Sequence, residues 1–431
     1  MRKQEAAVLL AGLLCRLGLA MFTAHPYDLA LFATSQRLYY QLGYVDFKFF
    51  PTLPAIYYIQ LVFYAPYALL TSLGVPDYQF LYHTTFMIEG LFLKLPMILA
   101  DVGSFLVLKR LTKQLLPSAL FFLNPFMIFL TAAWGIYDAL MIFPLLLGFY
   151  MVSTGGSRTM TIVAFVVSGL IKLFGFVPFA MLLATSLLRK RFKQFATFAT
   201  VGAVITTIIV APFLISGGFQ LFSTGIISRF IGTSTVAYSY PKPSSYNLIQ
   251  ISSGINLSFF TPIALGLVVL GYVIDSRRVN YGVTQVLLVK WCFIGAVAFN
   301  VVSGSEPQWL SWTIPLGILY GFLTGRSGIQ YFSYIFGIAA TFLTMTLLQS
   351  SGYLLTGTGM LLLSYVEGFS NNVIFYSALT FILLIFLSAY AFIDRMKHFR
   401  IEVIPLVILL YFQAYFWIVI VNVPRVLGAV S

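Results

Sequence analysis

The chain has 431 residues, of which 60% are hydrophobic and only 9% are charged, and its mean hydropathy is +0.94. So few charged side chains cannot solvate the surface of a globular protein of this length, so the composition predicts a polytopic membrane protein. The net charge of +13 does not indicate nucleic-acid binding, because most Lys and Arg residues form short clusters between apolar runs. Cys15 and Cys292 both lie in apolar segments, which argues against a disulfide framework or a cysteine metal site.

Apolar runs of roughly 17 to 25 residues are long enough to cross a membrane as helices. We interpret the first run as a retained helix, because no small-x-small cleavage site precedes His25. The run 159–188 contains Lys172, Gly175 and Pro178, which favours two short helices in a hairpin. The sequence thus predicts an all-α fold of about thirteen spans: 6–23, 86–108, 115–132, 139–153, two within 159–188, 193–214, 257–274, 281–302, 309–324, 329–350, 372–393 and 400–422.

The segment 54–74 is apolar but rich in Pro and Tyr, so it either crosses the membrane or lies at its surface. If the N-terminus is cytoplasmic and 54–74 does not cross, sixteen Lys and Arg face the cytoplasm and five face outward. The same ratio results if the N-terminus is outside and 54–74 crosses. The basic start Arg2-Lys3 favours the first arrangement, in which 24–85 is one outer loop with interfacial helices.

Six carboxylates face outward in that arrangement, and two have unusual surroundings. Asp28 begins a short amphipathic stretch that is predicted to lie on the membrane plane. Asp138 lies in a tight junction between two spans, where an ionised group is costly. Such a pair can activate an acceptor hydroxyl, bind a divalent cation such as Mg²⁺ or Mn²⁺, or orient a sugar, and a purely structural role stays equally open. The others are Glu306 in a short outer turn and three carboxylates interpreted as solvated: Asp46, Asp77 and Glu367.

Charged residues also fall inside the predicted spans. Glu89, Lys94 and Asp101 share one helix, and Lys94 and Asp101 are seven residues apart, which predicts a structural ion pair on one helix face. Lys172 lies at the turn of the hairpin near the outer side. It either meets a lipid-linked phosphate or extends to water with no further role.

Two outer segments combine aromatic side chains with polar or charged ones. The loop 215–256 contains Arg229, Lys242 and Tyr246, and the turn 303–312 contains Glu306, Gln308 and Trp309. Such side chains stack on sugars and hold phosphates, although this composition is also common at membrane interfaces. A nucleotide-binding fingerprint is missing, and the cytoplasmic loops are too short to fold, which disfavours a soluble sugar-nucleotide donor.

Six short motifs follow one another along the chain: HPYDLALF, FFPTLPAIYYI, KLPMILADVGSFLVL, FLNPFMIFLTAAWGIYDALMIFPLLL, SGLIKLFGFVP and EPQWLSWTIPLGIL. Together they resemble the GT-C superfamily of polyprenyl-phosphate-sugar glycosyltransferases, across about residues 20–320. The segments from Asn124 to Asp138 and around Glu306 are most similar to the catalytic subunit of the first GPI mannosyltransferase and its prokaryotic relatives.

The resemblance implies an integral membrane transferase that acts on the extracytoplasmic face. It implies a catalytic module at 1–320, including outer loop 24–85, followed by further helices at 321–431. Asp28 would be the base or acceptor-orienting group and Asp138 its partner. Many relatives carry paired acids where this chain has His25 and Asp28, so His25 is a candidate ligand or base and the need for a metal is in question. The substrate-binding candidates are His25, Tyr27, Lys94, Lys172, Arg229, Lys242, Tyr246, Glu306, Gln308 and Trp309.

The expected reaction is inverting transfer of a hexose, with mannose as the expected sugar, from a polyprenyl- or dolichyl-phosphate donor to a glycan, lipid or protein acceptor. The competing interpretation is a transporter or flippase, in which Glu89, Lys94, Asp101 and Lys172 would form a translocation path. The third interpretation is a non-catalytic assembly subunit. No partner subunit is identified from the sequence.

Overall fold

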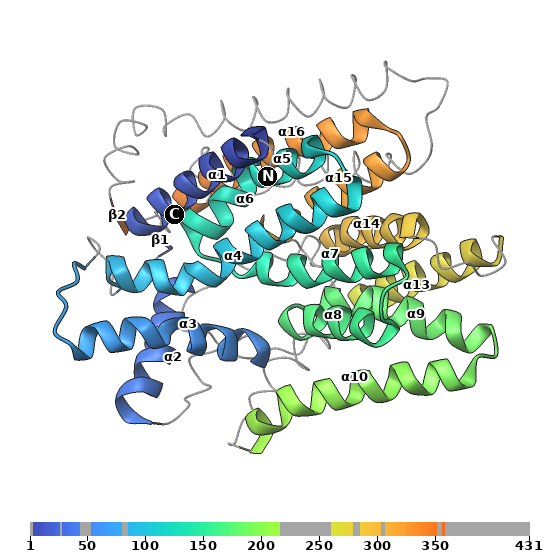
Figure 1. The fold of residues 1–431 in the computed structure, drawn as a ribbon, viewed down its shortest axis with the longest axis horizontal. Coiled ribbons are helices and arrows are strands. Elements are labelled where there is room, and N and C mark those ends of the chain that lie inside the picture. Colours follow the sequence, from blue (N-terminus) through green and yellow to red (C-terminus); the bar gives the residue numbers. More distant parts are fainter. Residues whose placement is uncertain are drawn as a thin grey trace, which may run out of the picture.

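The computed structural model describes residues 3–25, 28–43, 53–79, 85–215, 260–278, 285–302, 307–350 and 356–357. These ranges are almost entirely helical, and most of the helices lie side by side in one bundle (Figure 1). The elements are α1 (Lys3–Phe22), β1 (Thr23–Ala24), α2 (Asp28–Leu42), α3 (Pro54–Ser72), α4 (Met87–Thr112), α5 (Leu115–Phe122), α6 (Pro125–Ile128), the π-helical turn η2 (Phe129–Trp134), α7 (Asp138–Thr154), α8 (Arg158–Ile171), η3 (Leu173–Gly175), α9 (Phe176–Leu188), α10 (Phe192–Phe213), α13 (Phe260–Arg278), α14 (Gln285–Val302), η8 (Pro307–Trp312), α15 (Thr313–Leu323), α16 (Ser327–Ser350) and β2 (Thr356–Gly357).

The described helices include several that are suited to a membrane. By length and composition, α1, α4 and α10 can each cross it, and the pair formed by α5 and α6–η2, bent by 48°, can form a fourth span. The helices α7, α8 and α9 are apolar but shorter. Each predicted span within the described residues coincides with a helix or a broken helix. The predicted spans 372–393 and 400–422 lie outside the described residues.

The hairpin predicted within 159–188 is confirmed. Helix α8 ends at Ile171, Lys172 is extended (φ −143°, ψ 132°), and α9 begins at Phe176. A Cβ atom on Gly175 would lie 2.3 Å from the carbonyl carbon of Ser168, so the turn requires a residue without a side chain. The chain therefore reverses within four residues and brings Lys172 to the tip of the hairpin.

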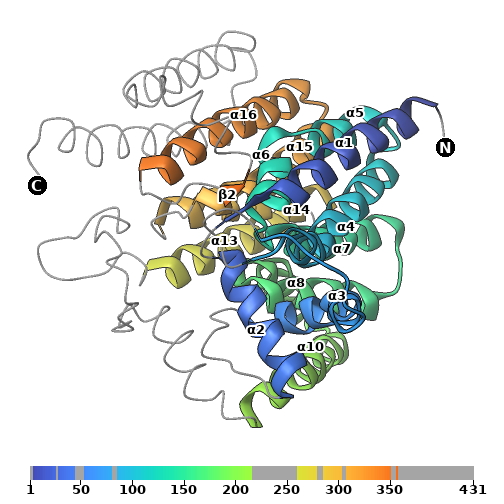
Figure 2. The same ribbon diagram turned by 90° about the vertical axis from the view of Figure 1, so that its left-hand side faces the viewer.

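The two helices of the first outer loop run in different directions. Helix α2 lies across the bundle, whereas α3 runs roughly parallel to α4 and is seen end-on in Figure 2. The interfacial placement of α2 and of 54–74 stays a prediction, and α3 follows the direction of the neighbouring candidate span α4. Among the described helices, however, α3 is not one of those apolar enough to qualify as a span by itself.

Basic residues gather at one end of the bundle, as the charge pattern predicts. The turns α7–α8, α9–α10 and α15–α16 lie at the right-hand end in Figure 1, opposite the loop between α1 and α4. These turns carry Arg158, Arg189, Lys190, Arg191, Lys193 and Arg326. Because cytoplasmic loops of membrane proteins are enriched in Lys and Arg, this distribution is typical of a cytoplasmic end.

The predicted ion pair between Lys94 and Asp101 is wrong. Asp101 pairs instead with Arg16 on α1 (Nε to Oδ2, 2.8 Å) and accepts a hydrogen bond from Thr131 on η2 (2.9 Å). Arg16 also donates to the carbonyl oxygen of Phe122 (2.8 Å). All of these side chains are buried, so a single ionic cluster joins α1, α4, α5 and η2.

The predicted boundary at residue 320 does not coincide with a break in packing. Helix α16 packs against α5, α6 and η8, and Asn124 donates to the carbonyl oxygen of Tyr334 (3.1 Å). The strand β2 pairs antiparallel with β1, where Thr23 is opposite Gly357 and Ala24 opposite Thr356. Residues 356–357 therefore lie directly beside the segment that leads into His25.

We expect Asp101→Leu to destabilise the protein by about 3–5 kcal/mol, because it leaves Arg16 as an unpaired buried charge. The double variant Arg16→Met/Asp101→Leu removes both charges and should be more stable than the single variant. Thermal unfolding in detergent measures both. Asp275→Leu is the control, because Asp275 pairs with Lys290 (2.9 Å) at a partly exposed position. This substitution should therefore lower the free energy of unfolding by less than Asp101→Leu does. Equal losses in the single and double variants would contradict this account.

Candidate functional site

The first cluster of the site surrounds Asp28, the first residue of α2. The indole Nε1–H of Trp134 donates to Asp28 Oδ2 at 2.6 Å, and the His25 ring stacks on that indole (centroids 4.9 Å apart, 18° between planes). His25 Nδ1 lies 3.3 Å from the same carboxylate oxygen. The Asp28 side chain is 24% exposed, so its carboxylate is held in place and still reaches the surface.

The hydrogen bonds around His25 define its role. Its Nδ1 accepts the backbone N–H of Asp28 at 3.1 Å. This bond, together with the ring stacking, places His25 between the start of α2 and the Trp134 ring. Both described contacts of the Asp28 carboxylate use Oδ2.

The second cluster surrounds Asp138, the first residue of α7. Lys172 Nζ lies 3.0 Å from Asp138 Oδ2, and the indole Nε1–H of Trp312 donates to Oδ1 at 2.5 Å. The ammonium also lies over the rings of Tyr137 (4.7 Å) and Trp312 (5.6 Å), and Phe174 stacks on Trp312 (5.0 Å). The Asp138 side chain is only 1% exposed. Asp138 is thus a buried, ion-paired group that positions Lys172 and Trp312.

One short segment, 134–138, reaches both clusters. It begins at Trp134, which holds Asp28, and ends at Asp138 itself. Between them, Tyr137 contacts Phe32 of α2 edge-on (centroids 5.8 Å apart). The two predicted carboxylates are therefore linked through a shared segment, and each receives an indole N–H.

Lys94 lies behind this segment and is not accessible to a substrate. It is fully buried, and its three N–H groups face four backbone carbonyl oxygens within hydrogen-bond distance of Nζ: Ala20 (3.5 Å), Thr23, Ala132 (2.8 Å) and Ala133 (3.2 Å). These carbonyls end α1 and η2. The interpretation of Lys94 as a substrate-binding residue is therefore not supported by its position.

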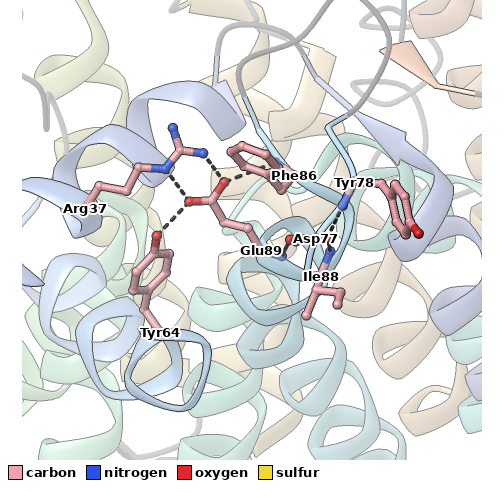
Figure 3. A network of polar contacts seen from close by, with 7 residues as sticks. All are labelled: Arg37, Tyr64, Asp77, Tyr78, Phe86, Ile88 and Glu89. Atoms are coloured by element: carbon pink, nitrogen blue, oxygen red, sulfur yellow. Dashed lines mark hydrogen bonds and ion pairs between the residues drawn. The ribbon is translucent and has the colours of Figure 1, made fainter. Parts of the chain in front are cut away.

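A further polar network joins the helices of the first outer loop (Figure 3). Glu89 of α4 pairs with Arg37 of α2 (Nε to Oε1, 2.6 Å) and accepts a hydrogen bond from Tyr64 of α3 (2.6 Å). Burial opposes the charge of Arg37, but the hydrogen bond and negative charge of Glu89 outweigh it and raise the Arg37 pKa.

Asp77 has a defined role in this network, which corrects its interpretation as a solvated loop residue. Its carboxylate accepts the backbone N–H groups of Ile88 (2.9 Å) and Glu89 (3.1 Å) in the first turn of α4 (Figure 3). These N–H groups have no partners within the helix, so a carboxylate at this position stabilises the helix start.

The other predicted residues are distributed as follows. Gln308 is buried, and Trp309 contacts Phe299 (centroids 4.9 Å apart) and Trp312 (6.0 Å) in an aromatic cluster beside Asp138. The structure does not bring Gln308 or Trp309 to the Asp28 carboxylate by any described contact. Seven predicted positions lie outside the described residues: Tyr27, Asp46, Arg229, Lys242, Tyr246, Glu306 and Glu367.

The described residues do not provide a good donor set for Mg²⁺ or Mn²⁺. No group of three or more His, Cys, Asp or Glu side chains gathers in the described ranges. Both Asp138 oxygens already face Lys172 or Trp312, and a cation would have to compete with the ammonium. We therefore assign no metal-dependent step to these residues.

Three side chains that hold carboxylates were not predicted as their partners: Trp134, Trp312 and Arg16. The outer turn 303–312, which includes Trp312, was expected on the same surface as Asp28 and Asp138. A tryptophan at a span junction is the available signal, although the acid that it bonds is distant in sequence in both cases. A buried indole N–H needs an acceptor.

No protein-family model matches this chain, and no curated protein sequence is significantly similar to it.

We expect Gly135→Ala to destabilise the protein by about 2–4 kcal/mol. Gly135 has φ +86°, and a Cβ atom there would lie 3.0 Å from Lys94 Cε and 3.1 Å from Leu29 Cδ1. Gly155→Ala is the matched control, because Gly155 also has positive φ (+64°) but open space around it, so it bears only the backbone cost of about 1 kcal/mol. Thermal unfolding compares the two, and equal losses would show that the close packing around Gly135 is unimportant.

Proposed function

We propose that the chain is a GT-C-type membrane glycosyltransferase of about thirteen spans, with its active site on the extracytoplasmic face. It transfers a hexose, with mannose the expected sugar, from a polyprenyl- or dolichyl-phosphate donor to a glycan, lipid or protein acceptor. Asp28 is the base. The proposal is supported by the motif resemblance and by one observation: Asp28 is a partly exposed carboxylate (24%) that the Trp134 indole orients through a hydrogen bond.

The reaction that suits this carboxylate is a single displacement. The acceptor hydroxyl oxygen forms a bond to the anomeric carbon while the bond from that carbon to the phosphate oxygen breaks. The hydroxyl proton passes to Asp28 Oδ1, and the lipid phosphate leaves with the bonding electron pair. One displacement inverts the anomeric configuration and needs no covalent sugar–enzyme intermediate.

The leaving phosphate needs positive charge near it. Lys172 is a described candidate, but it is paired with Asp138, so its contribution is smaller than a free ammonium would give. Arg229 and Lys242, outside the described residues, are the remaining candidates for this role.

The transporter interpretation gains no support from the buried charges. Its proposed path consists of Glu89, Lys94, Asp101 and Lys172, and each has its own protein partner. Glu89 pairs with Arg37, Lys94 with backbone carbonyls, Asp101 with Arg16, and Lys172 with Asp138. Groups that are separately satisfied provide no continuous series of exchangeable sites.

We expect Asp28→Asn to abolish hexose transfer without loss of folding, because the amide cannot accept the hydroxyl proton. Purified protein is assayed with polyprenyl-phosphate mannose or glucose and mixed membrane acceptors. Asp77→Asn is the matched control: it makes the same change in the same outer loop, keeps one oxygen acceptor for the start of α4, and should retain transfer. Near-normal transfer by Asp28→Asn would overturn the proposal.

We expect Trp134→Phe to lower kcat roughly 10- to 100-fold, because a hydrogen bond to a charged group is worth about 1.5–3 kcal/mol. Phenylalanine retains a ring to stack on His25 but loses the N–H that orients Asp28. Steady-state kinetics measure the effect. Trp291→Phe is the control, because it removes an indole N–H that donates to a different carboxylate, Asp275 (3.0 Å). Equal kcat values for the two variants would contradict the role of Trp134.

A further inference from the structure

We infer that Lys94 is the positioning residue of the Asp28 site: its ammonium clamps together the two chain segments that carry Asp28 and Trp134. The placement follows from the described contacts alone. Only its kinetic consequence rests on the proposed glycosyltransferase function.

The clamp consists of contacts from one ammonium nitrogen to four carbonyl oxygens, which share its three N–H groups. Two acceptors, Ala20 and Thr23, belong to the end of α1 and the residue that follows it, and two, Ala132 and Ala133, belong to the end of η2. The last carbonyl oxygens of a helix lack partners within the helix and carry partial negative charge. A buried ammonium placed between two such ends satisfies both, and the ends in turn stabilise its charge.

The residues that follow the contacted carbonyl groups in the chain are the residues of the Asp28 site. On the α1 side the chain continues from Thr23 to His25 and Asp28, and on the η2 side Trp134 follows Ala133 directly. The Trp134 indole then bonds to Asp28 across the junction. The length of that bond, 2.6 Å, depends on the distance between the two segment ends, which Lys94 sets.

The aliphatic part of Lys94 makes a second, independent contact with the same junction. A Cβ on Gly135 would lie within 3.0–3.2 Å of Lys94 Cε and Cγ and of Leu29 Cδ1. Gly135 therefore lies between the lysine stem and the residue that follows Asp28. The lysine is packed against the site by its stem and bonded to it by its ammonium.

A double-mutant cycle tests whether Lys94 acts through Trp134. We expect Lys94→Met to lower kcat about as much as Trp134→Phe, without raising the donor KM, and the double variant to be little worse than either. Lys94→Gln retains two N–H donors and should lose less activity. It also keeps the test informative if Lys94→Met does not fold. Additive losses, or a raised donor KM, would overturn the inference.

A labelling experiment tests the placement without using transferase activity. Asp28→Cys is made in a chain that lacks Cys15 and Cys292, and its rate of reaction with a membrane-impermeant maleimide is measured. We expect Lys94→Met to increase that rate several-fold, because Trp134 no longer covers the position. Lys290→Met is the control, since that lysine pairs with Asp275 away from the clamp. An unchanged or lower rate would overturn the inference.

The two experiments separate the possible failures. If the unmodified chain transfers no sugar but Lys94→Met accelerates labelling, the proposed function is wrong and the positioning role of Lys94 stands. If the unmodified chain transfers sugar and Lys94 variants change neither kcat nor labelling, the function stands and the positioning role is wrong.

Discussion

Charges buried in the bundle need partners within the protein, and this need decides which segments meet. In a membrane there is no bulk water to solvate an ammonium or carboxylate at depth, so an unmatched charge is costly. Arg16 of α1 forms an ion pair with Asp101 of α4. Lys172, in the α8–α9 hairpin, forms an ion pair with Asp138 of α7. Lys94 has no described carboxylate partner and is matched by helix ends instead. Each of these three arrangements holds a different set of helices and turns together.

The pairing of buried charges explains why Asp28 and Asp138 differ in their partners and in their exposure. Asp138 lies at a buried junction and forms an ion pair with Lys172, so this cluster has no net charge available to a substrate. Asp28 lies shortly after the end of α1, and its described partners are the Trp134 indole and the His25 ring. Its side chain is 24% exposed, whereas that of Asp138 is 1% exposed. Sequence alone placed the two residues in one class, but burial and partners separate them.

The helices could be predicted because their signal is local. Apolar runs and breaks such as Gly175 located the described spans and the α8–α9 hairpin. The partners could not be predicted in the same way. A spacing of seven places Lys94 and Asp101 on one face of α4, but it does not say which other helix packs there, and Arg16 and η2 supplied the partners. The direction of α3 likewise depends on Glu89 and Tyr64, which join it to α4.

The paired use of tryptophan is the feature that best connects these observations. An indole N–H orients a carboxylate through a single directed hydrogen bond and brings no charge, whereas a lysine neutralises the group it holds. At Asp138 both devices are present, and the carboxylate serves the structure. At Asp28 the indole acts beside the His25 ring, and Lys94 contacts backbone carbonyl oxygens of the two adjoining segments, not the carboxylate. A buried lysine can thus join the segments that carry the site without itself pairing with the carboxylate on which the proposed chemistry depends.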